Sequence, residues 1–126
     1  PGVNRVLLTF GPGDKELQAE VESFLAKEPD PALLLPGQLP LPRWAALVSH
    51  CEAVVSPDTG SLHQAVALGK PIVALYEARK FDHCSSQWSP WQVERAIIRR
   101  ESPAVTIPLI AREVQRLRRE GRKSNV

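Results

Sequence analysis

A six-residue polar segment, DTGSLH, follows an apolar run and carries the side chains best suited to chemistry. Its members are Asp58, Thr59, Gly60, Ser61, Leu62 and His63. Gly60 allows a ligand to approach the main chain closely. The N–H groups of Gly60, Ser61 and Leu62 would lie free at the start of a helix, where the helix dipole favours an anion. The segment therefore predicts a binding site for a diphosphate with a sugar attached.

Individual polar groups of this segment have expected roles. Main-chain N–H groups would hold the phosphates, and Asp58 would accept hydrogen bonds from sugar hydroxyls. His63, one turn into the helix, could donate to a phosphate or a hydroxyl. The alternative is an ordinary helix start, in which Asp58 or Thr59 is the N-cap and His63 is a surface residue. The six residues by themselves fit both interpretations, and the flanking elements favour the binding site.

Two apolar strands and one short helix must position the segment. Ala53–Val55 is an apolar run that is expected to be buried, and residues 56–60 end it. Ser61–Leu68 then has the spacing of a helix. Gly69 stands where a helix needs a left-handed C-cap, and Pro71–Tyr76 has the unbroken apolar character of a parallel strand. In such a unit, the loop after the first strand lies at the carboxyl edge of the sheet, where ligands bind.

The same alternation of strands and helices runs through the rest of the chain. Before the segment we predict a strand at Arg5–Phe10, a helix capped by Asp14 that ends near Lys27, and a strand at Ala32–Leu35. A second helix follows, with Pro42 at or near its first turn and an apolar stripe formed by Trp44, Leu47, Val48 and Cys51. After it we predict irregular chain over residues 77–89 anchored by Phe81 and Trp88, a strand at Val93–Arg99, and a helix from about Ile110 to Arg119. This order predicts an α/β fold: a Rossmann-like parallel sheet with helices on both faces, in a single domain spanning residues 1–126.

Three familiar chemistries lack their motifs. Residues 11–13 (GPG) follow a strand as in dinucleotide-binding proteins, but Glu16 takes the place of the third glycine and no acidic residue ends the second strand. The sequence has no G-x-S-x-G elbow for a serine hydrolase. His83 and Cys84 are adjacent, but no C-x-x-C or H-x-x-x-H motif completes a metal-ligand set. We therefore expect no metal and no cofactor.

The composition is typical of a globular protein. Apolar residues make up 43%, and 16 Lys and Arg against 14 Asp and Glu give a net charge of +2, which does not indicate nucleic-acid binding. The basic residues between Arg112 and Lys123 are expected to form a solvated helix face, although they also allow a peripheral contact with an anionic membrane surface. The two cysteines are far apart, and the sequence shows no signal peptide or membrane-spanning run. We therefore predict a reduced cytoplasmic protein, which would lie at the inner face of the inner membrane if the peripheral contact forms.

Two stretches of the sequence share a longer pattern with a known family. FGPGDKE and LPLPRWAALVSHCEAVVSPDTGSLHQAVALGKPIVALYE contain a glycine-bearing turn, a short helix, an apolar strand, D-T-G-x-x-H-x-A, then G-x-P and another apolar strand. In this pattern the chain resembles glycosyltransferase family 9, the ADP-heptose:lipopolysaccharide heptosyltransferases. The likeness covers Arg5 to about Tyr76 and is weaker as far as Leu117. D-T-G-x-x-H is its most specific part.

The resemblance implies one half of a GT-B fold, in which two Rossmann-like domains face each other across a cleft. The carboxyl-terminal domain of such enzymes binds the nucleotide-sugar donor. Carried over by position, Asp58, Thr59, Gly60 and His63 would meet the diphosphate and sugar, Leu39 would line the adenine, and Asp14 or Glu16 would hold the ribose. The partners implied are this donor and, through the other domain, a glycan or lipid-linked acceptor.

The chain also departs from the family pattern. In the family pattern, the donor domain begins with one more strand and a loop that carries a phosphate-contacting lysine, and an acceptor domain with the general base comes before it. We expect neither in the sequence from Pro1 onward, and Glu77 replaces a glycine of the pattern. On this pattern we expect a fragment, inactive alone, of an inverting glycosyltransferase that moves a heptose-like sugar from ADP-heptose to a lipopolysaccharide-type or other glycan. The alternatives are a degenerate GT-B-like domain that binds without catalysis, and another GT-B enzyme such as a sugar-nucleotide epimerase.

Overall fold

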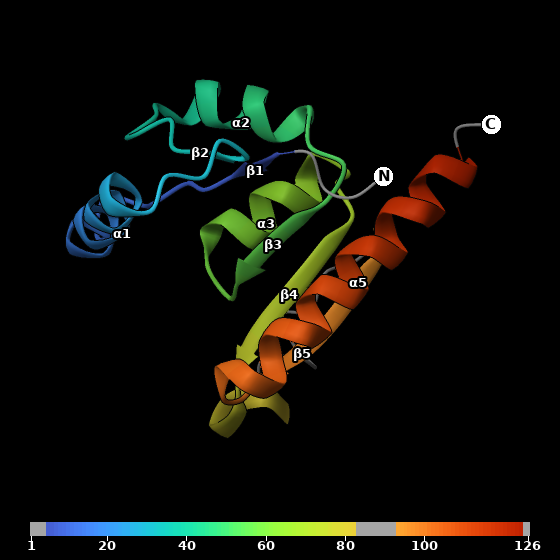
Figure 1. Cartoon of the computed structure of the whole chain (residues 1–126). Helices are drawn as coiled ribbons and strands as arrows, with labels where there is room; N and C mark the ends of the chain where they lie inside the picture. The colour runs from blue at the N-terminus through green and yellow to red at the C-terminus, as the bar shows by residue number, and fades with distance from the viewer. Residues whose placement is uncertain (1–4, 83–92, 125–126) are drawn as a thin grey trace. The chain divides into compact units, whose positions relative to one another are not determined.

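The computed structural model describes residues 5–82 and 93–124 of the chain. Contacts divide the chain into two compact units, Pro1–Leu41 and Pro42–Val126. The first unit contains β1 (Val6–Leu7), α1 (Lys15–Lys27) and β2 (Leu33–Leu34) (Figure 1). The second contains β3 (Val54–Pro57), α3 (Gly60–Ala67), β4 (Ile72–Glu77), the short 3₁₀ helix η1 (Ala78–Lys80), β5 (Arg95–Arg100) and α5 (Pro103–Ser124), and α2 (Leu41–Ser49) begins at the boundary. Trp88, His83 and Cys84 lie outside the described residues.

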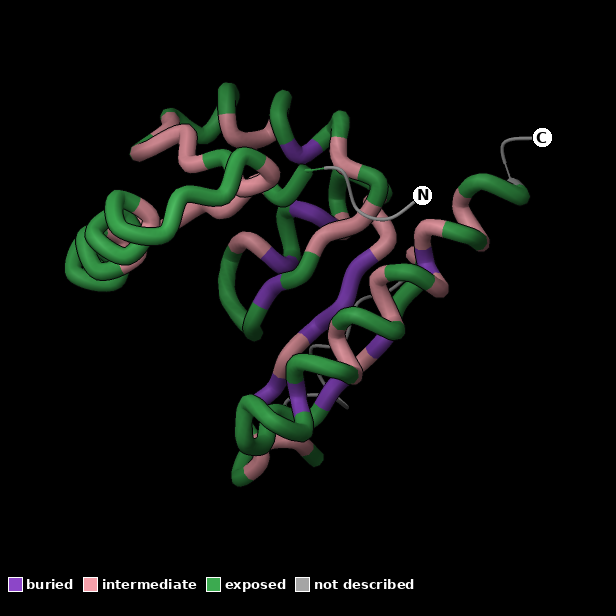
Figure 2. Tube along the Cα trace, viewed as in Figure 1, coloured by how far each residue is buried: buried purple, intermediate pink, exposed green. Residues whose placement is uncertain are grey.

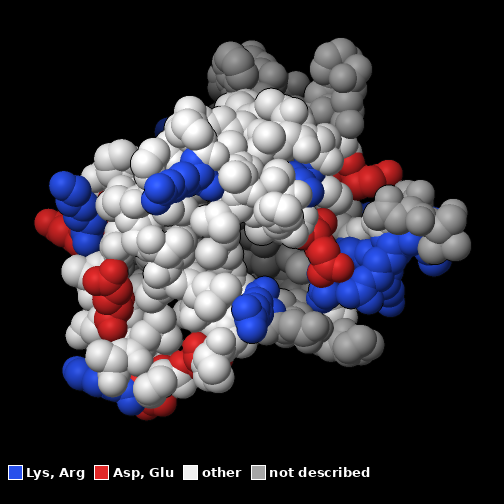
Figure 3. Space-filling view, turned by 90° about the horizontal axis from the view of Figure 1, so that it is seen from above, with Lys and Arg blue, Asp and Glu red and all other residues white. Residues whose placement is uncertain are grey.

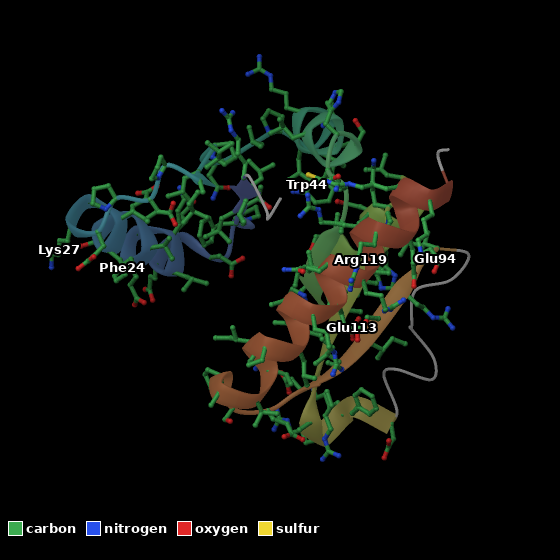
Figure 4. All side chains as sticks on the ribbon, turned by 45° about the vertical axis from the view of Figure 1, so that its right-hand side comes forward. Phe24, Lys27, Trp44, Glu94, Glu113 and Arg119 are labelled. Carbon is green, nitrogen blue, oxygen red and sulfur yellow. The ribbon has the colours of Figure 1, made fainter. Side chains whose placement is uncertain are left out.

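In the first unit, β1 and β2 form a small parallel sheet. Val6 is aligned with Leu33, and the Val6 N–H donates to the carbonyl of Ala32 at 2.8 Å. Both strands are shorter than predicted, at two residues each. The helix predicted to Lys27 is confirmed as α1, with Asp14 at its N-cap position. No α1 side chain is buried, and Phe24, labelled in Figure 4, is 62% exposed.

In the second unit, three parallel strands lie in the order β3-β4-β5. Val54 of β3 is aligned with Ile72 of β4, which is aligned in turn with Arg95 of β5. The central strand β4 is the most buried, as the run of buried positions along it in Figure 2 shows. Parallel pairing buries a strand on both faces, which explains why β4 has no polar alternation.

Helices cover both faces of this sheet. Alternate residues of β4, namely Ile72, Ala74 and Tyr76, pack with Leu62 and Ala65 of α3 and with Val48 of α2. Trp44 of α2, labelled in Figure 4, packs against the same cluster. The intervening Val73 packs with Leu117 of α5 and with Ala96 and Ile98 of β5. The predicted fold class, a Rossmann-like α/β arrangement of parallel strands with helices, is therefore confirmed. That the whole chain forms one domain stays a prediction.

The end of α3 fixes where β4 begins. Gly69 has φ +70°, the left-handed conformation predicted for it. Its N–H donates to the carbonyl of Val66 at 2.9 Å, and the N–H of Lys70 donates to the carbonyl of Ala65 at 3.1 Å. These two bonds form a Schellman motif, which turns the chain directly into Pro71 and β4.

We expect Gly69→Ala to lower the free energy of unfolding by about 1–2 kcal/mol, because a Cβ is disfavoured in the left-handed conformation. Urea denaturation followed by circular dichroism measures the change. Gly13→Ala is the control, since a Cβ at Gly13 meets nothing within 4 Å and the φ of Gly13 is not in that region. Equal effects of the two substitutions would contradict this account of the C-cap.

Two expectations for β3 are wrong. Residues 56 and 57 do not end the strand, because β3 continues through Pro57, which is aligned with Leu75 of β4. Pro57 is tolerated because β3 is an edge strand, where a proline removes no ladder hydrogen bond. Val55 is not buried but 44% exposed, because the core contacts of α5 lie over β4 and β5 rather than over β3.

The last helix is longer than predicted. It begins at Pro103, seven residues before Ile110, and contains Pro108. The N–H groups of Val105 and Thr106 both donate to the carbonyl of Ser102, so the chain is already turning there. Pro108 removes one hydrogen bond to Ala104, whose exposed position leaves its carbonyl open to water.

The predicted anchor Phe81 is confirmed by its contact after η1. Its ring meets Tyr76 edge to face, with ring centroids 6.4 Å apart. Phe81 also packs against the core cluster on the α3 face of the sheet. This contact holds the chain that leaves the carboxyl end of β4.

Candidate functional site

The predicted DTGSLH segment follows the carboxyl end of β3. The N–H of Asp58 donates to the carbonyl of Leu75 at 3.2 Å, which continues the pairing with β4 for one more residue. Asp58, Thr59 and Gly60 are exposed, and α3 begins at Gly60. The segment therefore lies at the edge of a parallel sheet where α/β proteins bind ligands.

The first turn of α3 keeps two main-chain donors open. Thr59 is the N-cap residue, with an extended φ of −141°, but its side chain makes no capping hydrogen bond to the main chain. Its hydroxyl instead lies 2.7 Å from the hydroxyl of Ser61. Among the residues that the structure describes, the N–H groups of Gly60 and Ser61 have no acceptor. An ordinary capped start would engage such a donor with the N-cap side chain, whereas these two donors are open to water or to an external anion.

The prediction that the N–H of Leu62 lies free at the start of the helix is wrong. This N–H donates to the carbonyl of Thr59 at 3.1 Å, and the side chain of Leu62 is fully buried in the core between α3 and β4. The third N–H of the helix is engaged because the first turn closes on the N-cap carbonyl. His63, the next residue, is exposed one turn into α3. The segment thus divides into an outward part that can meet a ligand and an apolar residue that fixes the helix to the sheet.

Space for a ligand is open above Gly60. Within residues 5–82 and 93–124, a Cβ built on Gly60 would meet no heavy atom within 4 Å, and the φ of Gly60 is not in the left-handed region. The glycine is therefore required neither by packing within the protein nor by backbone strain. Without a Cβ, the main chain at Gly60 is open to close approach from outside the protein.

Beneath the exposed turn lies a buried hydroxyl that sequence reasoning took as part of a loop. Ser56 is only 3% exposed, and its Oγ donates to the carbonyl of Pro57 at 2.9 Å. The same Oγ lies 2.9 Å from Oγ of Ser61 on the first turn of α3. The alternation of β3, which turns Val54 and Ser56 toward the same face, could have indicated this position.

Charged residues follow the neighbouring strands at the same edge. The pKa of the Glu77 carboxyl is lowered by a hydrogen bond from Arg79, at 3.1 Å, and by the charges of Lys80 and Arg100. Glu77 ends β4 and is aligned with Arg100 at the end of β5. The departure from the family pattern at Glu77 therefore adds a neutralised carboxylate rather than an unpaired negative charge. Sequence reasoning missed these basic groups because their place depends on how far β4 and β5 extend.

The residues predicted to meet a nucleoside lie in the first unit. Asp14 and Glu16 are exposed at the start of α1, and Leu39 is partly buried in the chain after β2. The carboxylate of Asp14 does not cap α1 but accepts the N–H of Gly11 at 3.1 Å. Gln38, in the chain after β2, contacts α1, since its Nε2 donates to Oε1 of Gln18 at 2.9 Å.

Other features of the described chain bear on the choice of ligand. Among the residues described, no group of three or more His, Cys, Asp or Glu side chains could hold a metal ion. A hollow of about 400 Å³ lies beside β5 and α5, and one of about 740 Å³ lies near Lys70 and Arg118. Neither is lined by residues 58–63, which form an open turn on one exposed edge. No helix within the described residues is long and apolar enough to cross a membrane.

Parallel strands, helices on both faces and an open turn at the carboxyl edge define a Rossmann-like α/β protein. Residues 2–107 match the model of glycosyltransferase family 9 (heptosyltransferase). The chain therefore belongs to this family, which is a GT-B family, and the resemblance of the DTGSLH stretch is confirmed.

Three curated relatives illustrate the similarity. Lipopolysaccharide heptosyltransferase 3 of Escherichia coli is 30% identical over 86 residues, which are 68% of this chain and 24% of that protein. The protein of the same name from strain K12 is 31% identical over 87 residues, 69% of this chain and 24% of its own. Lipopolysaccharide heptosyltransferase 2 of strain K12 is 43% identical over 42 residues, 33% of this chain and 12% of that protein. The matched part is thus about a quarter of the length of the first two, and no solved structure matches the chain.

Proposed function

We propose that Asp58, Thr59, Gly60, Ser61 and His63 bind the diphosphate and sugar of a nucleotide-sugar donor, and that the chain is the donor-binding half of an inverting glycosyltransferase. The observation that carries this proposal is the pair of main-chain N–H groups, from Gly60 and Ser61, that have no acceptor among the described residues and lie beside open space. Asp58 accepts hydrogen bonds from sugar hydroxyls, and His63 donates to a phosphate or hydroxyl.

The transfer moves a heptose-like sugar from ADP-heptose to a lipopolysaccharide-type or other glycan. Family membership and the names of the relatives support this choice of sugar and acceptor. The basic residues Arg79, Lys80 and Arg100 support an anionic donor at this edge. In the first unit, Leu39 and either Asp14 or Glu16 meet the adenine and ribose.

In the reaction, the oxygen of an acceptor hydroxyl forms a bond to the anomeric carbon of the sugar. The bond from that carbon to the diphosphate oxygen breaks, and its electron pair leaves with the nucleoside diphosphate. The acceptor proton passes to a carboxylate base from another domain. The N–H groups of Gly60 and Ser61 stabilise the charge that develops on the leaving oxygen, a kind of contact worth on the order of 3 kcal/mol each.

We also propose that the protein is cytoplasmic and has no nucleic-acid partner. Lys and Arg side chains lie among acidic and uncharged residues on the face shown in Figure 3. Several basic residues of α5 are also paired: Arg118 lies 2.7 Å from Glu52, and Arg116 lies 2.6 Å from Glu113. These pairs favour a solvated helix face, with peripheral membrane contact as a minor role.

Titration of the 15N-labelled chain with ADP, UDP and GDP tests the proposal. We expect the amide resonances of Gly60 and Ser61 to shift with ADP, because their N–H groups acquire phosphate acceptors. We also expect calorimetry to give tighter binding for ADP than for UDP or GDP. Pyrophosphate should shift the same two resonances, while the Gly121 resonance on α5 serves as an internal control.

Other outcomes would replace the proposal. Shifts confined to residues outside 58–63 would move the anion site elsewhere. A preference for UDP would favour another GT-B enzyme, such as a sugar-nucleotide epimerase. Absence of binding by all three nucleotides would favour a degenerate domain that no longer takes a donor.

A further inference from the structure

Three hydroxyl groups form a chain beneath the proposed diphosphate site. Oγ of Ser56 lies 2.9 Å from Oγ of Ser61, which lies 2.7 Å from Oγ1 of Thr59. Ser56 is the buried end of this chain, and Thr59 is the exposed end. The chain therefore connects the interior of the sheet to the helix start.

The direction of each hydrogen bond follows from the carbonyl at the buried end. The carbonyl of Pro57 can only accept, so the single hydroxyl hydrogen of Ser56 is donated to it at 2.9 Å. Ser61 must then donate to Ser56, and Thr59 must donate to Ser61. The contact from Thr59 to the same Pro57 carbonyl is long, at 3.5 Å, and competes weakly for the Thr59 hydrogen.

This direction has a consequence for the site above. The hydroxyl hydrogens of Thr59 and Ser61 point along the chain and are not available to a ligand. The main-chain N–H groups of Gly60 and Ser61 are therefore the donors that the turn presents. Their aim depends on how firmly the first turn of α3 is held against the end of β3, since an oxyanion site works through preorganised donors.

We infer that Ser56 is a positioning residue: through Ser61 it fixes the first turn of α3, so that the Gly60 and Ser61 N–H groups face the diphosphate of the donor. The inference rests on the proposed function of residues 58–63. It assigns to Ser56 no contact with the ligand, because the side chain is 3% exposed and lies behind Ser61. Ser56 is held in place by its pairing in β3, where it is aligned with Ala74 of β4.

A double-mutant cycle on the 126-residue chain tests the inference, with ADP and pyrophosphate as probes. We expect Ser56→Ala and Ser61→Ala each to weaken binding by about three- to tenfold, the size of one net hydrogen bond. The double variant should bind no more weakly than either single variant, because both substitutions break the same chain. Ser61→Thr retains the hydroxyl and should restore most of the affinity.

The two ideas can fail separately. If ADP shifts the Gly60 and Ser61 resonances of the unsubstituted chain but Ser56→Ala binds equally well, the positioning role is wrong and the donor site stands. Additive losses in the double variant would also overturn the role, since Ser56 would then act without Ser61. If the unsubstituted chain does not bind, both ideas fall. Should Ser56→Ala not fold, Ser61→Ala compared with Ser61→Thr decides the question, because Ser61 is only partly buried.

Discussion

Replacing Gly60 by alanine should remove most of the affinity for ADP while leaving the fold intact. The added methyl group meets no atom of the described part of the chain within 4 Å, so it enters the space that the proposed donor occupies. A phosphate oxygen that accepts the Gly60 N–H must come to about 2.9 Å from that nitrogen, and a neighbouring Cβ obstructs this approach. We expect calorimetry to show at least about tenfold weaker binding, a loss of about 1.4 kcal/mol.

The stability of Gly60→Ala separates this effect from unfolding. Alanine lowers the conformational entropy of the unfolded chain, so the free energy of unfolding should stay equal or rise by up to about 1 kcal/mol. Gly121→Ala is the matched control, because a Cβ there also meets nothing within 4 Å and Gly121 lies on α5, away from the proposed site. Unchanged ADP affinity in Gly60→Ala would mean that the phosphates do not lie against this turn.

Local signals in the sequence located the unit around the site. Gly69 and Pro71 marked the end of α3 because a left-handed residue and a proline each restrict the main chain through their own covalent structure. The same holds for the apolar character of β4, which reflects burial on both faces. These features depend on a few consecutive residues, and the structure has them where they were predicted.

Features that depend on distant neighbours were not predictable in the same way. Val55 is as apolar as Val73, yet it is exposed because β3 is an edge strand and α5 lies over β4 and β5. For Val55 the packing of another element decides the outcome, and no single stretch of sequence contains it. The last helix was predicted only from about Ile110, but α5 begins at Pro103 and continues through Pro108.

The site itself was predicted in outline rather than in detail. The turn, its exposure and its place after β3 follow from the order of elements. Which of its residues face a ligand and which face the core does not follow from that order. Leu62 has an apolar side chain at a helical position that can face either, and its contacts with β4 show that it faces the core. Ser56 likewise became part of the site because α3 lies on the same face of β3.

Leu62→Ala should produce the largest loss of stability among the substitutions considered, about 3 kcal/mol. Its side chain is fully buried with Ala65, Ile72 and Tyr76, so truncation removes apolar burial and leaves a cavity. Urea denaturation measures this loss. Leu68→Ala is the matched control, because the same truncation at a leucine that is 38% exposed, at the end of the same helix, should cost well under half as much.

The two substitutions together separate folding from binding. A ligand at one hundred times its Kd raises the free energy of unfolding by about 2.7 kcal/mol, whatever the starting stability. We therefore expect ADP, at a concentration one hundred times the Kd for the unsubstituted chain, to stabilise Leu62→Ala by the same increment as the unsubstituted chain. The increment should be much smaller for Gly60→Ala at that concentration, because its site is obstructed. If ADP failed to stabilise folded Leu62→Ala, Leu62 would have to contribute to the ligand site directly, and its assignment to the core alone would be wrong.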